Sequence, residues 1–464
     1  MVERRVTLAC AFALFVAQGC VAPLPQTEGP EPLPLGREFP VHDAPREVGE
    51  RKGRPEPDEE PVEGEVTLSR ALALALLRSP NLAAVAWDVR VADARRLQAG
   101  LLPNPEIEVE VEDFAGTGTL AGFDGAETTI VLSQLIELGG KRAARKQVAA
   151  FDAQLAAWGY ETARLAVLTE TTLTFLDVLG AQERLQLAEE SHRLAQEVLS
   201  TVAERVKAGK VSPLEEMRAA VTLSKSAIDL DKASRSLDIS RSFLAASWGS
   251  SRAGFDRVAG ELDSVASIPS FESVAGLVAR NPEIARWAQE MEQRLAVLAR
   301  ERAGRVPDLT LGIGVKHISE VDASALVFGL SIPIPLFDRN QGAILEARYE
   351  LARAGHAKKA AEVRTWAALA AAYHTLASAH SEALSLRDDV LPAAQHAYAA
   401  ARESYQEGKL GYLDILDAQR TLMEAKRSHV DALMTYHKAV AVVESLIGTG
   451  LNDVPSGSNQ KHGE

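Results

Sequence analysis

The pattern of apolar and polar positions changes from a helical period to strict alternation at four places in the chain. Between residues 106 and 112, three apolar residues alternate with four glutamates: Ile107, Val109 and Val111 with Glu106, Glu108, Glu110 and Glu112. A period of two sends successive side chains to opposite faces of a strand. Three later stretches alternate in the same way. We therefore expect strands over about residues 104–114, 127–137, 308–318 and 324–334.

Helical periodicity fills the chain between these strands. The first helical pattern begins at Val66, with Thr67 as the expected N-cap, and Pro80 interrupts it. A longer pattern follows Gly140 and runs to about Lys207, and its counterpart in the second half reaches about residue 407. A helix of roughly 65 residues is about 100 Å long, which no globular domain requires. Within the second long helix, apolar residues recur every seven positions, as in coiled coils: Leu369, Leu376, Ala383 and Val390.

The two long helices end in related turns. Residues 205–221 read RVKAGKVSPLEEMRAAV and residues 405–422 read YQEGKLGYLDILDAQRTL, with Gly209 and Gly408 lying 199 positions apart. Internal similarity at this spacing indicates two structural repeats. We expect a first repeat over residues 65–248 with its tip turn at 205–217, and a second over 271–447 with its tip turn at 405–417. A less regular link, residues 249–270, joins them, and residues 448–464 form a polar tail.

Four such strands suit a membrane but cannot close a barrel alone. Strands of nine to eleven residues with one apolar face match those of transmembrane barrels. An open edge would leave backbone groups unpaired in hydrocarbon, so several copies must share one barrel. The sequence therefore predicts an α+β membrane protein whose long helices extend the barrel. A soluble helical bundle carrying a small sheet is the alternative, and it explains neither the helix length nor the paired amphipathic strands.

The N-terminus has the layout of a secretory signal, expected over residues 1–19. Arg4 and Arg5 precede an apolar run from Val6 to Val16, which is too short to span a bilayer. The sequence Ala-Gln-Gly-Cys that follows is similar to a bacterial lipoprotein cleavage box, which would make Cys20 the lipidated first residue. Ordinary cleavage nearby is the alternative. Residues 20–64 are rich in proline, glycine and charge, which predicts a lipid-anchored tether.

Composition and motifs exclude several functions. The formal net charge of −14 argues against a nucleic-acid partner and is compatible with a surface that meets cations. The chain has no HExxH, CxxC, GxSxG or phosphate-loop pattern, so we expect neither an enzyme nor a cofactor. The pairs His374/His380 and His429/His437 lack the i,i+4 spacing of a helical metal site, so no metal site is expected.

Carboxylates are the remaining candidates for function. Asp414 and Asp417 lie at i,i+3 spacing after the second turn. Acidic residues in a first helical turn also stabilise the helix by about 0.3–1 kcal/mol, which is the alternative reading. The four glutamates between 106 and 112 would line a lumen if the apolar face meets lipid. There they would either favour cations or simply keep the pore wall wet.

Several motifs together resemble the TolC-type outer-membrane efflux channels, and more closely their heavy-metal branch, the CzcC/CusC type. They are LPNPEIEVEVE at residues 102–112, SQLIELGGKR at 133–142, GLSIPIPLFDRNQGAI at 329–344 and the second tip turn. The resemblance runs from Val66 to Ile447. It implies a homotrimer with a twelve-stranded barrel in the bacterial outer membrane, a helical barrel crossing the periplasm, and a mixed equatorial belt formed by the link and the chain ends.

The resemblance also implies a function. It predicts a passive exit duct in a tripartite efflux system, with a periplasmic adaptor protein and an inner-membrane resistance-nodulation-division pump as partners. Metal cations are the expected substrates, with small organic toxicants as the alternative. A lipid-anchored structural protein without conductance is a second class of hypothesis.

In the resembled family, carboxylates matching Asp414 and Asp417 form rings at the narrow periplasmic end. A tyrosine matching Tyr405 bonds to a carboxylate of the other half, here Glu215, and holds the entrance closed. A basic residue that assists this contact in the drug-export branch is replaced here by Leu410.

Overall fold

A computed structural model describes residues 29–42 and 62–454, and the chain divides into two compact units. Unit 1 comprises residues 89–157 and 289–354 with Gly29, and unit 2 comprises 30–88, 158–288 and 355 onward. Cys20, the expected signal segment, most of the expected tether and residues 455–464 lie outside the described residues.

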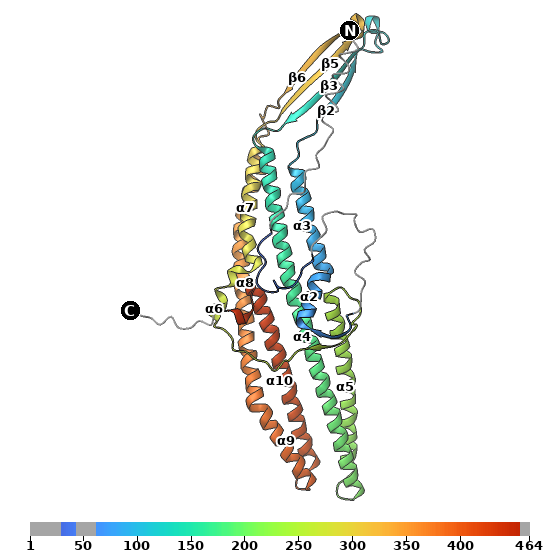
Figure 1. The fold of residues 1–464 in the computed structure, drawn as a ribbon, viewed down its shortest axis with the longest axis vertical. Coiled ribbons are helices and arrows are strands. Elements are labelled where there is room, and N and C mark those ends of the chain that lie inside the picture. The colour runs from blue at the N-terminus through green and yellow to red at the C-terminus, as the bar shows by residue number, and fades with distance from the viewer. Residues whose placement is uncertain (1–28, 43–61, 455–464) are drawn as a thin grey trace, which may run out of the picture. The chain divides into compact units, whose positions relative to one another are not determined.

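Unit 1 carries a four-stranded antiparallel sheet in the order β2-β3-β5-β6 (Figure 1). The strands are β2 (Glu106–Glu112), β3 (Glu127–Ile136), β5 (Leu309–Ile318) and β6 (Ala323–Ser331). Short 3-10 turns, η1 (Gly118–Leu120) and η3 (Ser319–Val321), lie between the strands of each hairpin. Strands β2 and β6 each pair on one side only, so both are edge strands.

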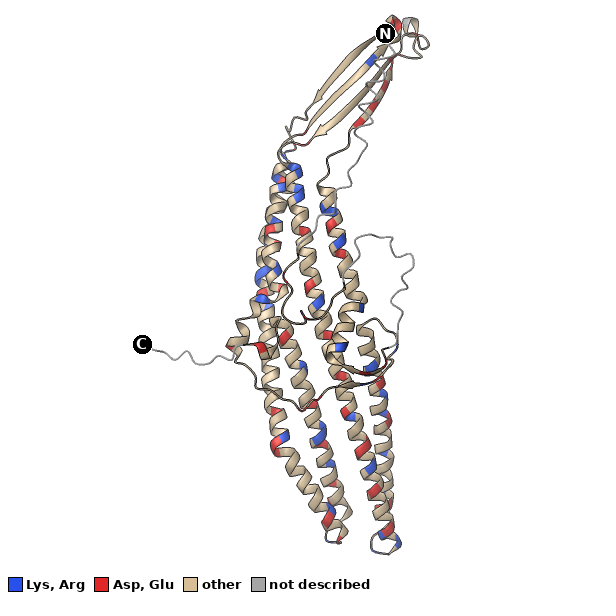
Figure 2. Cartoon of the chain, viewed as in Figure 1, with Lys and Arg blue, Asp and Glu red and all other residues tan. Residues whose placement is uncertain are grey.

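The register gives this sheet two different faces. Glu106 lies in one row with Ser133 and Gly312, and Glu110 in one row with Thr129 and Lys316, so the face bearing the β2 glutamates continues mostly into small or polar residues, with Val131 beside Glu108 as an exception. Figure 2 shows acidic positions along β2. The other face carries apolar side chains, as in the row Val109, Ile130, Val315 and Leu326. These apolar side chains are exposed, with Leu326 82% accessible. A monomer with such a face needs an apolar environment for it.

The strand ends are joined to helices by polar contacts within unit 1. The Arg145 guanidinium pairs with Glu137 and donates to the backbone carbonyls of Ala99 and Leu101, where α3 (Pro80–Ala99) ends. Lys141 begins α4 (Lys141–Lys207), and its Nζ lies 2.8 Å from Asp308 Oδ1, just before β5. These contacts give a structural role to residues 137–142, the second part of the 133–142 motif.

A second junction leads from β6 into α8 (Gln341–Ser385). Asn340, in a left-handed conformation with φ of 58°, donates from its amide to the backbone carbonyl and carboxylate of Glu301. Glu301 lies near the end of α7 (Pro282–Ala303), and the buried residues Leu298, Ile344 and Ala347 pack α7 against α8. Residues 338–342, within the 329–344 motif, thus connect β6 to α8.

Unit 2 contains two helical hairpins and a small parallel sheet. One hairpin joins α4 to α5 (Pro213–Ser247), and the other joins α9 (Leu391–Gln406) to α10 (Tyr412–Ile447) (Figure 1). Strand β1 (Gly64–Thr67) pairs in parallel with β4 (Phe255–Ala259), inside the stretch expected to be less regular. The remaining short elements are α2 (Leu68–Arg78), α6 (Phe271–Ala275), η2 (Val278–Arg280) and η5 (Leu451–Asp453).

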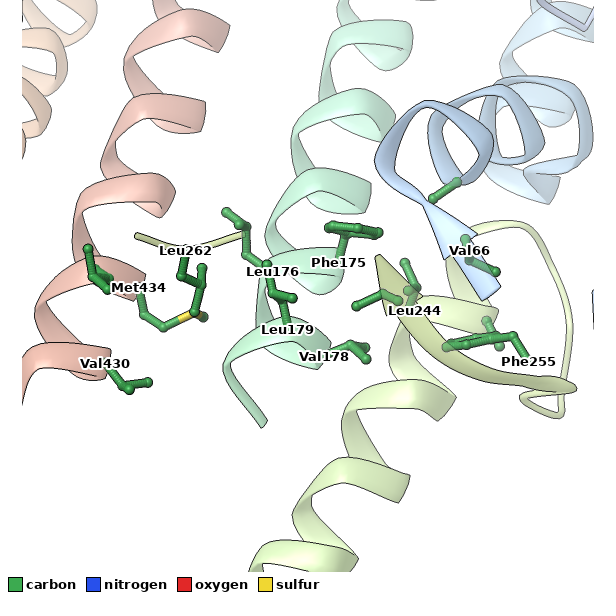
Figure 3. Packing of buried hydrophobic residues seen from close by; sticks show 14 of the residues in the cluster. Val66, Phe175, Leu176, Val178, Leu179, Leu244, Phe255, Leu262, Val430 and Met434 are labelled. Carbon is green, nitrogen blue, oxygen red and sulfur yellow. The ribbon is translucent and has the colours of Figure 1, made fainter. Parts of the chain in front are cut away.

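The largest apolar core of unit 2 surrounds this small sheet (Figure 3). Val66 from β1 and Phe255 from β4 are fully buried against Val178 of α4 and Leu244 of α5, and Met434 adds a contribution from α10. Thr67 is the N-cap of α2, and its hydroxyl accepts from the Arg70 amide at 3.3 Å. This packing ties the link between the repeats to both hairpins.

The expected heptad pattern in the second long helix is wrong at its last position. Leu369, Leu376 and Ala383 are buried, but Val390 is 43% exposed. A π-helical segment, η4 (Leu386–Val390), separates α8 from α9. Pro392 lies two residues after this segment, and proline removes a backbone donor and clashes with the preceding turn. The resulting shift of phase turns Val390 away from the core.

Among the described residues, no single helix is both long and apolar enough to cross a membrane. Helices α2 and α3, bent by 42° at Ser79, satisfy that test together by length and composition.

Candidate functional site

The two hairpin turns of unit 2 share one backbone geometry. Gly209 and Gly408 both have positive φ, 66° and 79°, in the region that glycine adopts without strain. In each turn the next amide bonds back across the turn, from Lys210 to the Arg205 carbonyl and from Lys409 to the Ser404 carbonyl, both at 2.9 Å. This is the Schellman pattern of helix termination. Ser212 then caps α5, with Pro213 at its first position.

An apolar cluster joins the four helices near these turns. It includes Val202 of α4, Ala219 of α5, Tyr405 of α9, and Tyr412 and Ile415 of α10, all buried. Two hairpins from different halves of the chain are therefore packed into one tip.

Arg205 makes the most specific contact between the hairpins. Its guanidinium carbon lies 4.4 Å from the centre of the Tyr405 ring, and its Nη1 donates to the Tyr405 carbonyl at 2.6 Å. Sequence reasoning missed Arg205 because it concentrated on carboxylates. The available signal was its place in the first tip turn, four residues before Gly209.

Tyr405 and Glu215, the expected closing pair, form no hydrogen bond with each other within one chain. The Tyr405 hydroxyl and Glu215 Oε2 are both buried without a hydrogen-bond partner among the described residues, and so is the Tyr412 hydroxyl. Burial raises the pKa of the Tyr405 phenol, and the charge of Arg205 opposes that rise. The role of Tyr405 and Glu215 in closing an assembled channel stays a prediction.

Asp414 and Asp417 lie on the exposed side of the start of α10. The Asp414 carboxylate accepts the Gly411 amide at 2.9 Å, so it caps the helix as the alternative reading required. Asp417 is exposed one turn further, and its backbone carbonyl accepts the Thr421 hydroxyl at 3.0 Å. Asp414 caps through its Oδ2 alone, and its carboxylate is exposed, so capping and a ring of carboxylates are compatible.

The four glutamates of β2 are exposed on one face of the unit 1 sheet. Lys316 of β5 lies on that same face and pairs with Glu127 of β3. The face is therefore acidic along β2 with one neutralised pair beside it. Its orientation toward a lumen stays a prediction.

Within the described part of the chain, no group of three or more His, Cys, Asp or Glu side chains is placed to hold a metal ion. The histidines of unit 2 make other contacts. His374 stacks on Phe271, His437 lies 2.7 Å from the Leu262 carbonyl, and the His429 Nε2 lies 3.4 Å from Asp263.

Comparison with known proteins extends these observations. The chain is 34% identical to the cobalt-zinc-cadmium resistance protein CzcC of Cupriavidus metallidurans over 284 residues, 61% of this chain and 66% of that protein. It is 28% identical to the nickel-cobalt-cadmium resistance protein NccC of Alcaligenes xylosoxydans, over 62% of this chain and 64% of that protein. The chain thus spans slightly less than two thirds of either relative.

The fold has counterparts among solved structures. The open state of the MtrE outer membrane channel from Neisseria gonorrhoeae superposes with a TM-score of 0.70 at 20% identity, covering 83% of this chain and 89% of MtrE. A family model described as outer membrane efflux protein matches residues 71–250 and 276–449 separately. Together these ranges cover most of the chain, and the chain belongs to the outer membrane efflux protein family.

Proposed function

We propose that this protein is the outer-membrane channel of a tripartite efflux system, acting as a passive homotrimeric duct. The observation that carries the proposal is the unit 1 sheet, which has two unpaired edge strands and one exposed apolar face. Edge strands in hydrocarbon must find partners, because an unpaired backbone group there costs several kcal/mol. Three copies joined from β2 to β6 would close a twelve-stranded barrel with its apolar face toward lipid.

The length of the helices supports an extension from that barrel into the periplasm. Helix α4 alone has 67 residues, which corresponds to about 100 Å at 1.5 Å per residue. The matching hydrogen bonds at Gly209 and Gly408, and the two separate family matches, support a duplicated unit with repeats at residues 65–248 and 271–447. In a trimer, six hairpin turns would form the periplasmic end.

These turns are suited to a periplasmic adaptor protein. Apolar side chains are exposed around both turns: Leu214, Met217, Leu410 and Leu413. Their exposure on the tip, beside Lys210 and Lys409, gives a surface with apolar contacts and a charged rim. An inner-membrane resistance-nodulation-division pump would complete the assembly and supply the energy. Lipidation of Cys20 would anchor the chain in the outer membrane.

Heavy-metal cations are the proposed substrates. The names of CzcC and NccC both refer to resistance to divalent metals, including cobalt and cadmium. The exposed carboxylates of β2, and Asp414 and Asp417 at the tip, would give a duct acidic groups in the barrel and at the hairpin turns. Small organic toxicants are the alternative substrates, and sensitivity of a deletion strain to Co²⁺, Zn²⁺ and Cd²⁺ measured against organic toxicants separates the two.

Single-channel recording in planar bilayers tests the duct itself. We expect stepwise conductance with a reversal potential that indicates preference for cations. The double substitution Asp414→Ala and Asp417→Ala removes the proposed ring at the narrow end and should raise the open probability. A silent wild-type protein together with a silent double variant would favour a structural lipoprotein and refute the duct.

A further inference from the structure

A surface pocket of about 540 Å³ lies in unit 1, where β6 leads into α8. Its lining combines three arginines with four apolar residues and one amide: Arg305, Arg339, Arg348, Leu336, Phe337, Ile344, Leu345 and Gln341. No carboxylate lines it. We call it the junction pocket, and none of the roles described above uses it.

The charge of the junction pocket is not compensated by its neighbours. Arg305 and Arg348 form no ion pair with the described residues, and the Arg339 guanidinium donates to the Leu336 carbonyl, at 3.3 Å, but to no carboxylate among them. A larger adjoining pocket of about 740 Å³ shares Arg305 with it, but its lining also includes Lys141 and two carboxylates, Asp308 and Asp338, and Lys141 pairs with Asp308. The net positive charge is therefore specific to the junction pocket, which indicates an anionic occupant.

Apolar exposure runs from the sheet into this pocket. Leu330 at the end of β6 is followed by Ile332, Ile334 and Leu336, all exposed, and Phe337 is 91% exposed. Tyr349, one residue after Arg348, is 66% exposed. Aromatic and basic residues at the end of an apolar band are typical of a membrane–water interface. Figure 2 shows Lys and Arg positions, in blue, gathered at the ends of the unit 1 helices that meet the strands.

We propose that the junction pocket binds the headgroup of an anionic phospholipid, with the acyl chains against the apolar face of β6. The assignment rests on the proposed function, because it requires the sheet to span a membrane. Arginine guanidinium groups bind phosphate through paired, charge-assisted hydrogen bonds, and a phospholipid matches both the three arginines and the apolar side chains beside them. The helix-side end of the sheet would place this headgroup in the periplasmic leaflet.

Native mass spectrometry of the purified full-length protein in neutral detergent tests the proposal, with dioleoyl phosphatidylglycerol and dioleoyl phosphatidylcholine as probes. We expect phosphatidylglycerol to bind at least about tenfold more tightly than phosphatidylcholine. The variant Arg305→Gln, Arg339→Gln, Arg348→Gln should lose this preference, because each basic residue near a lipid surface contributes about fivefold in affinity. Replacement of the same three residues by lysine should retain most of it.

A matched control removes three exposed arginines of unit 2: Arg193→Gln, Arg235→Gln and Arg364→Gln. It should keep the lipid preference. Equal binding of both lipids by the wild type, or an unchanged preference in the triple variant, would overturn the proposal. A triple variant that dissociates into monomers would also overturn it, because the pocket would then be an interface between copies. The single substitution Arg348→Gln, at an exposed helical position, is a milder change than the triple variant. It should weaken the binding of phosphatidylglycerol about fivefold.

Bilayer recordings separate this proposal from the proposed function. Normal conductance in a wild type without lipid preference would reject the lipid site alone. Absence of conductance in the wild type and in the double variant Asp414→Ala, Asp417→Ala would reject the duct.

Discussion

Substitution of Arg205 by methionine should loosen the tip between the two hairpins. Methionine keeps an apolar stem but removes the guanidinium, which stacks on Tyr405 at 4.4 Å and donates to its carbonyl at 2.6 Å. A hydrogen bond from a charged group contributes about 1.5–3 kcal/mol, and a cation–π contact about 0.5–2 kcal/mol. Because Arg205 is only half-buried, we expect a combined loss of about 2–3 kcal/mol in the free energy of local opening.

Hydrogen–deuterium exchange of peptides covering residues 402–412 measures this loss. A change of about 2–3 kcal/mol corresponds to roughly 30- to 150-fold faster exchange at the Gly408 and Lys409 amides, which close the turn. The control Arg193→Met removes an exposed arginine from the same helix, where it pairs with Glu197, and should leave these amides unchanged.

A double-mutant cycle with Tyr405→Leu isolates the ring contact, because leucine keeps the backbone carbonyl. We expect a coupling energy of about 0.5–2 kcal/mol between Arg205 and the Tyr405 ring. Unchanged exchange in Arg205→Met, or equal changes in Arg193→Met, would refute the cross-hairpin role of Arg205. The milder change Tyr405→Phe should not speed exchange within one chain, because the hydroxyl has no hydrogen-bond partner among the described residues.

Three further predictions follow from individual contacts. Asp414→Ala should lower the stability of the α10 N-terminus by about 0.5–2 kcal/mol, measured by exchange, while Asp417→Ala should leave stability unchanged and reduce cation preference in bilayers. Equal effects of the two substitutions on stability would contradict the capping role of Asp414. Gly139→Ala should lower the thermal unfolding temperature more than Gly140→Ala: both have positive φ, but only at Gly139 would a new Cβ meet Val306 Cβ at 2.6 Å. Burial raises the pKa of Glu444, with the Leu451 amide opposing, so its folded state favours the protonated form. The contribution of Glu444 to the free energy of unfolding is fully present below the usual pKa of 4.5. It is lost as the pH rises through the raised pKa of the folded state. Glu444→Gln should therefore flatten the fall in stability above about pH 4.5 in denaturation curves, and an unchanged slope would contradict this.

The sheet shows how far the sequence alone could reach. Alternation located four strands because a sheet with two different faces imposes a period of two. The predicted ends of these strands were less accurate. Strand β2 begins at Glu106, after Pro103 and Pro105, and β6 ends at Ser331, before Pro333, since proline donates no ladder hydrogen bond.

Other features depend on contacts between distant segments, which periodicity does not record. The parallel pairing of β1 with β4 joins residues about 190 positions apart, in short strands that lack a repeated pattern. The Arg205 contact with Tyr405 likewise joins two halves of the chain. The family membership was predicted from the order of motifs, and the comparisons confirmed it. The break at η4 was missed because the heptad spacing continues unaltered in sequence as far as Val390, the last residue of η4.

Disulfide cross-linking between edge strands tests the trimeric barrel most directly. Strands β2 and β6 are separated by two strands in one sheet, about 14 Å, whereas a disulfide requires Cα atoms within about 7 Å. A cysteine at Val109 combined in turn with one at Ser324, Leu326, Phe328 or Leu330 can therefore bond only between copies. As the control, cysteines at Ile130 and Val315, which face each other, should bond within one chain. We predict covalent dimers and trimers on non-reducing gels for at least one β2–β6 pair. Monomers for every such pair, with the control bond formed, would contradict a barrel shared between copies.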